Sequence, residues 1–457
     1  MKKWLLFLVL GGLYLFVKSY GIHPTASGDE NTYFYMARLL ARGQLPYRDF
    51  FYAHPPLQLL LLGLVYAVFG YNFLLLKLTS FLPVLAGAGI LYSTACRRRG
   101  CLAGFAFMGI FLFGYEALKI TSHPFGLNLT VFFLCLSLSA FLSDRPGLSG
   151  LWTGLAGLTG LYAAPWGLIP VAYYLINARG SGRLARYVLF AAGVFFVGNA
   201  FLVILFGRAY VEPVYAYHLL KPPGRDLIAD VFIRVLRRNP LPFFLPLLYV
   251  WGRRDAKTSA LIWAGTVFVI FLARLNPLFT QYFLLPLPFL SLAAAESLVG
   301  WRERFVLSSL RRTILVGIFL LIAGSGIFSS ISAIAHERIT GFEHLSEVAS
   351  LIRENSQPDE LLFGHVTYAP LIALESDRQI ALNMVDTNHM RFRAGLADLP
   401  EILERLADEP QLRYVVIGES RFWLDPRIRD FLRRARLAGI FPVPQGRILV
   451  YDLKVEP

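Results

Sequence analysis

"HPTASGDENTYFYMARLLARGQLPYRDFFYAHPP" spans residues 23–56 and is the only long stretch in the first third of the chain that is not mostly aliphatic. It follows an apolar segment and contains two adjacent acids, Asp29 and Glu30. Aromatic residues come next, and His54 precedes two prolines. Such a stretch between apolar runs indicates a segment that has left a membrane and lies at its surface, where aromatic rings are enriched.

The composition of the whole chain is that of a membrane protein. Its 457 residues are 56% hydrophobic and 16% charged, with a mean hydropathy of +0.54. Soluble proteins carry about a quarter charged residues, and a span needs about 20 apolar residues. Several runs approach that length, which predicts a polytopic α-helical membrane protein. The net charge of +14 does not indicate a nucleic-acid partner, because most basic clusters lie at the ends of apolar runs.

The distribution of basic residues predicts the topology. With Lys2 and Lys3 in the cytoplasm, an uncleaved first span at about 4–20 places 23–56 outside. A crossing by the short run 57–70 would carry the arginines at 97–99 outside, so 57–70 is expected to be an interfacial or re-entrant helix. The later spans are expected at 73–95, 102–118, 124–142, 150–162, 164–177, 187–206, 241–252, 258–274, 282–299 and 313–333, for about 11 spans in all.

The last part of the chain differs in kind from the rest. We expect a membrane domain at 1–335 and a small extracytoplasmic α/β domain at 336–457. Within the second domain, "LRYVVIGES" and "GRILVYDLKV" read as strands, and "EHLSEVASLIREN" and "PRIRDFLRRARLAG" read as amphipathic helices. This domain shows no Gly-rich phosphate loop and no cluster of metal-ligating residues in its sequence.

The two acids of the opening stretch are open to two interpretations. Ser27 and Glu30 fit a capping box at the start of a helix over about 28–42, and Gly43 fits its C-terminal end. Acids at a helix N-terminus also complement the helix dipole. That interpretation accounts for Glu30 better than for Asp29, whose carboxylate at the membrane surface would suit a general base.

A family resemblance rests on the same residues. The order of a short span, "DE", an interfacial helix, "GQLPYRDF", "HPP" and an apolar run ending in "FG" resembles the GT-C superfamily of glycosyltransferases. The similarity is greatest to the protein O-mannosyltransferase and lipid A aminoarabinose transferase group. It covers about 1–300 and is strongest at 28–70. These enzymes use polyprenyl-phosphate-linked sugars and place interfacial helices in the first outer loop.

The resemblance implies roles for individual residues. Asp29, beside Glu30, takes the position of the catalytic base, and His54 lies where some relatives carry a lysine that binds the lipid phosphate. His123, in "SHPFGL", falls where relatives often have a second acid, a departure for which Glu116 could substitute. His54 could instead be a loop histidine that binds no ligand. His123 could be an N-terminal residue of the span at 124–142 and have no further role.

A late segment completes the resemblance. "RLNPLFTQYFLLPLPFL" at 274–290 is similar to the family's late outer loop and following span, which implies phosphate contacts from Arg274, Gln281 and Tyr282. Arg274 could also be a snorkelling charge, and Tyr282 an interfacial aromatic residue. The loop 207–239, with His218, Lys221 and Arg225, either covers the site or guides the lipid headgroup, or it is a solvated connection with a surface helix.

The function implied is transfer of a sugar from a polyprenyl-phosphate donor to an acceptor hydroxyl outside the cytoplasm, with inversion at the anomeric carbon. The acceptor could be a protein, lipid or glycan. No cofactor is expected; relatives differ in their use of a divalent metal, and His123 in place of an acid favours a metal-independent enzyme. A lipid-linked-sugar carrier and a membrane scaffold are the alternatives. A carrier is expected to show symmetric halves or mid-span charges, and neither is evident.

Overall fold

The chain divides into two compact units. The computed structural model describes residues 2–24, 28–124, 126–224, 227–250, 255–304, 317, 321, 324–336, 342, 344–419, 422–443 and 446–454. Unit 1 contains Met1–Ile22, Lys77–Phe201 and Pro223–Ala335, and unit 2 contains His23–Leu76, Leu202–Pro222 and His336–Pro457. Unit 2 thus joins 336–457 to two segments that the sequence analysis assigned to the membrane domain.

The regular secondary structure in the described residues of unit 1 is helical, and it includes residues 324–335. Its helices are α1 (Lys2–Ser19), most of α4 (Phe73–Arg99), α5 (Cys101–Leu112), α6 (Tyr115–Lys119), α7 (Gly126–Leu142), α8 (Pro146–Gly157), α9 (Ala164–Asn177), most of α10 (Arg183–Phe206), α13 (Ile228–Arg238), α14 (Pro240–Phe244), α15 (Ala256–Leu272) and α16 (Leu287–Arg304). Short 3₁₀ turns lie at Ile120–Ser122, Leu161–Ala163, Leu245–Val250 and Thr280–Leu284. Aromatic rings fill the core between them, as where Phe289 packs on Trp166 and Phe268.

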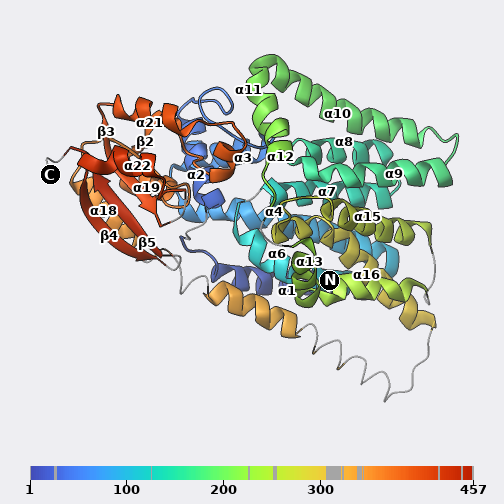
Figure 1. The fold of residues 1–457 in the computed structure, drawn as a ribbon. Helices are drawn as coiled ribbons and strands as arrows, with labels where there is room; N and C mark the ends of the chain where they lie inside the picture. The colour runs from blue at the N-terminus through green and yellow to red at the C-terminus, as the bar shows by residue number, and fades with distance from the viewer. Residues whose placement is uncertain are drawn as a thin grey trace. The chain divides into compact units, whose positions relative to one another are not determined.

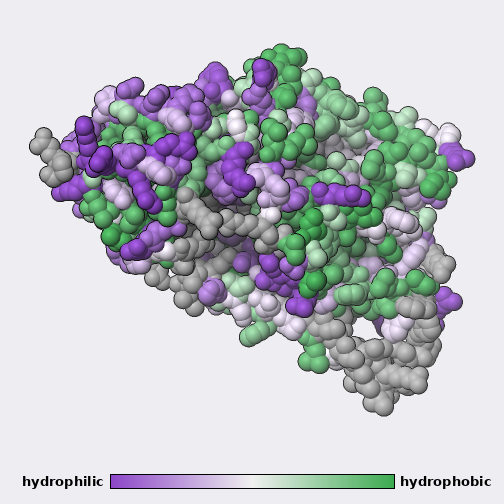
Figure 2. All heavy atoms as spheres, in the orientation of Figure 1, coloured by the Kyte–Doolittle hydropathy of each residue, from purple (hydrophilic) through white to green (hydrophobic). Residues whose placement is uncertain are grey.

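The helices of unit 1 carry a lipid-type surface. In α10, Leu189 and Val197 are each 70% exposed, although the helix is almost wholly apolar. Figure 2 shows hydrophobic side chains over α10 and its neighbours, and hydrophilic ones over the C-terminal sheet. An apolar helix with an exposed apolar surface is expected where lipid replaces water. The structure therefore supports a membrane location for these helices.

Few helices in the described residues meet a strict test for a span. By length and composition, α4 and α10 qualify, and α5 with the segment Tyr115–Ser122 qualifies as a pair bent by 66°. Five more apolar helices are shorter, including Leu57–Phe69 and Ala256–Leu272. The count of about 11 spans therefore stays a prediction. Of the last expected span, 313–333, only 317, 321 and 324–333 lie within the described residues.

The span predicted as one helix at 102–118 is broken in the structure. α5 ends at Leu112, and α6 starts at Tyr115 after Gly114, which has extended backbone angles. A Cβ added to Gly114 would lie 2.9 Å from Oδ1 of Asn239, and the same oxygen accepts a hydrogen bond from the backbone N–H of Tyr115 at 2.6 Å. The break is therefore held by a residue distant in sequence, which the local apolar pattern does not reveal.

Unit 2 contains a five-stranded sheet (Figure 1). The strands are β1 (Leu361–Gly364), β2 (Gln379–Ile380), β3 (Leu412–Gly418), β4 (Arg436–Val443) and β5 (Gly446–Asp452), in the order β2-β1-β3-β5-β4. β2, β1 and β3 are parallel, and β5 is antiparallel to β3 and β4. The helices that accompany the sheet are α18 (Leu345–Glu354), α19 (Ala369–Ser376), α20 (His389–Arg393), α21 (Leu399–Ala407) and α22 (Pro426–Phe431). The expected α/β character of 336–457 is confirmed.

We use "first outer segment" for residues 23–56, which the sequence analysis expects outside the membrane; the helix of this segment packs on the α/β part within unit 2. α2 (Gly28–Ala41) contacts both α3 (Leu57–Phe69) and α19. Asn31 donates through Nδ2 to the backbone oxygen of Thr367 at 3.1 Å, and the backbone N–H of Ile380 donates to the Tyr35 hydroxyl at 2.7 Å. These bonds tie α2 to the parallel half of the sheet.

Two local expectations were wrong. The helix expected at 426–439 ends at Phe431, continues as a 3₁₀ turn to Arg434, and is followed by β4. Pairing of β4 with β5 outweighs the local helical periodicity. The segment 207–239, expected as a polar loop that could include a surface helix, contains more helix than that, with α11 (Arg208–Val211), a π-helix (Glu212–Ala216), α12 (Tyr217–Leu220) and α13.

Candidate functional site

The helix that carries the two acids forms as predicted. α2 starts at Gly28, and its end is marked by Gly43, which has a positive φ of 84°. The N–H of Gln44 returns to the backbone oxygen of Leu39 at 3.0 Å, which satisfies a carbonyl of the last turn. The capping residue Ser27 lies outside the described residues.

The two acids have different surroundings. Glu30 is completely buried, whereas Asp29 is exposed. Burial suits the interpretation of Glu30 as part of the helix start. An exposed carboxylate remains accessible to a substrate, which a general base requires. The structure therefore separates the neighbours in the way the catalytic hypothesis for Asp29 needs, and the role itself stays a prediction.

The segment after α2 forms a tight aromatic turn that positions His54. Tyr47 has a positive φ of 70°, and its N–H bonds to the backbone oxygen of Phe50 at 2.9 Å. The Tyr47 hydroxyl donates to the backbone oxygen of His54 at 2.7 Å. The His54 ring then packs against Tyr33 and Tyr52, with centroids 6.1 and 5.8 Å away.

A second histidine lies against the first. The ring centroids of His54 and His218 are 5.5 Å apart, and Nε2 of His218 lies 2.7 Å from the backbone oxygen of Ala53. Because a carbonyl only accepts, that nitrogen carries the proton. Burial, helped by the charge of Lys221, lowers the pKa of His218 to about 4. Burial, with His218 and Lys221, also lowers the pKa of His54 well below its usual value. Both imidazoles are neutral near pH 7.

Lys221 is the cation beside these rings. Its Nζ lies 4.6 Å from the ring centroid of Tyr217, a cation–π distance. Burial lowers the pKa of Lys221, while the carboxylates of Asp29 and Asp386 act in the opposite direction. Lys221 thus interacts electrostatically with Asp29 of the first outer segment and with Asp386 of the C-terminal part.

Asp386 and Arg391 were not found from the sequence. Arg391 lies with its guanidinium carbon 4.2 Å from the Phe51 ring centroid, and its Nη1 donates to the backbone oxygen of Asp386 at 3.1 Å. Phe51 in turn meets Tyr217 edge-on, with centroids 5.6 Å apart. The sequence gives no sign that these residues lie together, because they come from three distant segments of the chain. We use "outer cluster" for Asp29, Phe51, His54, Tyr217, His218, Lys221, Asp386 and Arg391.

The remaining predicted residues lie in unit 1. Arg274 is exposed just after α15, and Gln281 is partly exposed. Tyr282 is buried, with its hydroxyl 3.3 Å from that of Tyr162. His123 is also buried, and its backbone oxygen accepts from Asn128 at 2.7 Å. The structure does not test their roles in binding phosphate or substrate.

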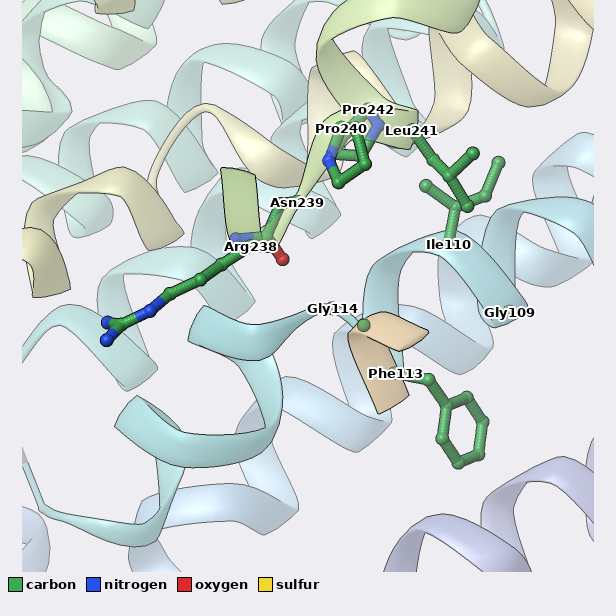
Figure 3. A pocket seen from close by; sticks show the side chains of 10 residues that line it. Gly109, Ile110, Phe113, Gly114, Arg238, Asn239, Pro240, Leu241 and Pro242 are labelled. Carbon is green, nitrogen blue, oxygen red and sulfur yellow. The ribbon is translucent and has the colours of Figure 1, made fainter. Parts of the chain in front are cut away.

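Glu116 has a hydrogen-bond partner that is distant in the sequence. Asn239 donates through Nδ2 to Oε2 of Glu116, and the carboxylate is completely buried. Figure 3 shows Asn239 near Gly114, at a cavity of about 30 Å³ that both residues line. A cavity of this size has room for about one water molecule. Glu116 is not among the residues that line it, so this cavity offers no access to the carboxylate.

No metal site is evident in the described part of the chain. Within those residues, no group of three or more His, Cys, Asp or Glu side chains is arranged to hold an ion. The outer cluster instead mixes two carboxylates, two cations and two neutral imidazoles. Such a set can take a proton and bind an anion without a metal ligand set, and metal independence stays a prediction.

The chain has the fold of solved GT-C enzymes, the fold that the sequence resemblance implies. It superimposes on ArnT from Cupriavidus metallidurans bound to undecaprenyl phosphate, with a TM-score of 0.72 and 14% identity over 98% of this chain and 97% of that one. The Archaeoglobus fulgidus oligosaccharyltransferase tethered to an acceptor peptide gives a TM-score of 0.55, at 13% identity over 98% and 74%.

A third structure adds a lipid-phosphate complex. AglB from Archaeoglobus fulgidus, with an inhibitory peptide and a dolichol-phosphate, gives a TM-score of 0.52 at 14% identity, over 90% of this chain and 69% of that one. Comparisons with models of protein families and with curated protein sequences find no match. The structural similarity thus confirms the fold that the motif from "DE" to "FG" led us to expect. The sequence identity to these structures is only 13–14%.

Proposed function

We propose that the chain is a membrane glycosyltransferase that moves a sugar from a polyprenyl-phosphate donor to an acceptor hydroxyl. Structures of the same fold hold undecaprenyl phosphate and dolichol-phosphate, which supports a lipid-phosphate donor. The observation that carries the proposal is the outer cluster, where exposed Asp29 lies within the electrostatic reach of Lys221 beside neutral His54. A base and a cation at one place are what this transfer requires.

The reaction has one base and one leaving group. The acceptor hydroxyl oxygen forms a bond to the anomeric carbon from the face opposite the phosphate, and its proton passes to the Asp29 carboxylate. The bond from the anomeric carbon to the phosphate oxygen breaks, and polyprenyl phosphate leaves with the electron pair. The configuration at the anomeric carbon inverts. A positioned base typically contributes about 10²–10⁴-fold to the rate.

Charge on the departing phosphate has to be stabilised by cations or donors. Lys221 supplies a positive charge where His54, at the position of a lysine in some relatives, is neutral. We propose that Lys221 takes over the function of that lysine, with His54 as a hydrogen-bond donor. Arg274, Gln281 and Tyr282 keep a proposed role as phosphate contacts, which rests on the sequence resemblance of 274–290 alone.

We further propose that the chain resides in the cell membrane, with its N-terminus in the cytoplasm and residues 336–457 outside. The position of the arginines at 97–99, at the C-terminal end of α4, supports this orientation through the positive-inside bias. The acceptor would be reached from the same side as the outer cluster. A lipid, glycan or protein acceptor is compatible with this arrangement.

The experiment that tests the function uses purified full-length protein in lipid nanodiscs. It is incubated with a panel of undecaprenyl- and dolichyl-phosphate-linked sugars and a cell-envelope extract as the acceptor source, and released polyprenyl phosphate is measured by mass spectrometry. Release with at least one donor supports the proposal. Binding of donors without any release across the panel would favour a carrier, and no binding would favour a scaffold.

A further inference from the structure

The Arg391 guanidinium has hydrogen-bond partners on one edge and, among the described residues, none on the other. Its guanidinium lies on the Phe51 ring, and its Nη1 donates to the backbone oxygen of Asp386 and, at 3.0 Å, to Sδ of Met384. These contacts fix the plane of the group. A guanidinium whose plane is fixed by an aromatic ring and by one nitrogen presents its other edge in a defined direction.

The other edge has no partner among the described residues. Nε of Arg391 is buried and has no acceptor there, and no described hydrogen bond or ion pair involves Nη2. A buried N–H without an acceptor costs about 1–3 kcal/mol, so such donors are normally satisfied. Nε and Nη2 together are the two-donor edge that pairs with two oxygens of a carboxylate or phosphate.

The surroundings of this edge favour an anion. The bond from Nη1 goes to the backbone of Asp386, while the Asp386 carboxylate accepts from the N–H of Asn388 at 3.0 Å. No described carboxylate forms an ion pair with Arg391 within 4.0 Å, although the charge of Asp386 acts on it from a longer distance. Lys221 lies on the adjoining ring, Tyr217, which meets Phe51 edge-on. Two cations thus lie on two touching rings in the outer cluster.

We infer that the Nε–Nη2 edge of Arg391, with Lys221 nearby, is a binding site for a phosphate or carboxylate group of a substrate. The inference rests on the proposed function for the identity of that substrate. Two sources have the required chemistry: the phosphate of the polyprenyl donor, and an anionic group on the acceptor. The C-terminal part of unit 2 then takes part in substrate binding through the loop that leads to α20.

The test measures binding by full-length protein in nanodiscs. The variants are Arg391→Gln, which removes the charge, and Arg391→Lys, which keeps the charge and the stem on Phe51 but lacks the two-donor edge. Arg393→Gln is the matched control, since it lies on the same helix with an exposed side chain. Undecaprenyl phosphate and undecaprenol are titrated first. Inorganic phosphate is then titrated into protein saturated with undecaprenyl phosphate.

The two arms distinguish the sources. Weakening of undecaprenyl phosphate binding by about tenfold or more in Arg391→Gln, with undecaprenol unchanged, assigns the site to the donor phosphate. Loss of inorganic phosphate binding with the lipid present assigns it to an anionic acceptor. If Arg391→Gln does not fold, the binding measurements on Arg391→Lys test the inference instead. A smaller loss of affinity is expected for Arg391→Lys. Wild-type affinities for both probes in folded Arg391→Lys and Arg391→Gln overturn the inference, even if sugar transfer is established.

Discussion

Arg38 on α2 bonds to Asp377, with Nη2 and Oδ1 2.7 Å apart, and so connects the first outer segment to the end of α19. Its Nη1 also donates to the backbone oxygens of Ala373 and Arg378, at 3.1 and 3.2 Å. The Arg38 side chain is only 2% exposed. The helix that carries the proposed base is therefore fastened to the C-terminal α/β part by a buried guanidinium.

Replacement of Arg38 by methionine is expected to destabilise unit 2 by about 2–3 kcal/mol, because two backbone oxygens lose a charged donor. The measurement is thermal unfolding of the purified protein. Arg42→Gln is the control: Arg42 is 45% exposed and 3.8 Å from Asp377, so its loss should cost less than about 1 kcal/mol. Equal effects of the two substitutions would contradict the anchoring role of Arg38.

Binding of the donor phosphate is expected to depend on pH through Lys221. Because burial lowers the Lys221 pKa, the ammonium loses its proton at a lower pH than an ordinary lysine. Affinity for undecaprenyl phosphate should thus decline as pH rises from about 7 to about 10. In Lys221→Arg the charge persists, and the affinity should stay level. A parallel decline in both proteins would show that another group is responsible.

Stability is expected to fall in weak acid because of the two buried imidazoles. Their pKa values are lowered on folding, to about 4 for His218, against 6.5 when unfolded. Between these values the unfolded chain binds more protons, so stability rises with pH there and is lost as pH falls below about 6.5. Each histidine contributes at most about 1.4 kcal/mol per pH unit. Melting temperatures across this range should be flatter in His54→Gln/His218→Gln; an unchanged slope would exclude the pair as its cause.

The break between α5 and α6 is expected to depend on Asn239. Asn239→Ala removes the acceptor for the Tyr115 N–H and the donor to Glu116, at a cost of about 1–3 kcal/mol for each group left unsatisfied. Glu116→Gln, which keeps an oxygen that can accept from Asn239, should cost less stability and retain transfer. Denaturation and turnover assays check both. A loss of transfer of about 100-fold or more in folded Glu116→Gln would instead support Glu116 as a second catalytic acid.

The sequence predicts best where a local rule governs the structure. α2 starts and ends near its predicted limits because acids lie at its first turn and Gly43 adopts a positive φ at its end. The helix at Leu57–Phe69 was expected from the apolar run 57–70, which ends at Gly70. These signals lie within a few residues of the element that they determine.

Elements determined by distant contacts were not predicted. Asn239 supports the turn at Gly114, and β5 pairs with Arg436–Val443, whose first four residues were expected to end a helix. Asp386 and Arg391 were missed for the same reason: neither belongs to a motif, and only folding brings them to Phe51 and Lys221. Asp29 and His54, by contrast, lie in the motif, and so sequence analysis finds them.

The measurement that tests the central claim most directly is single-turnover transfer by Asp29→Asn. Asparagine keeps the shape of the side chain but cannot take the proton, so release of polyprenyl phosphate should slow by about 10²–10⁴-fold while donor affinity stays within a few-fold of wild type. Asp29→Glu, which retains a carboxylate, should recover part of the rate. Turnover at the wild-type rate in Asp29→Asn would contradict the assignment of Asp29 as the base.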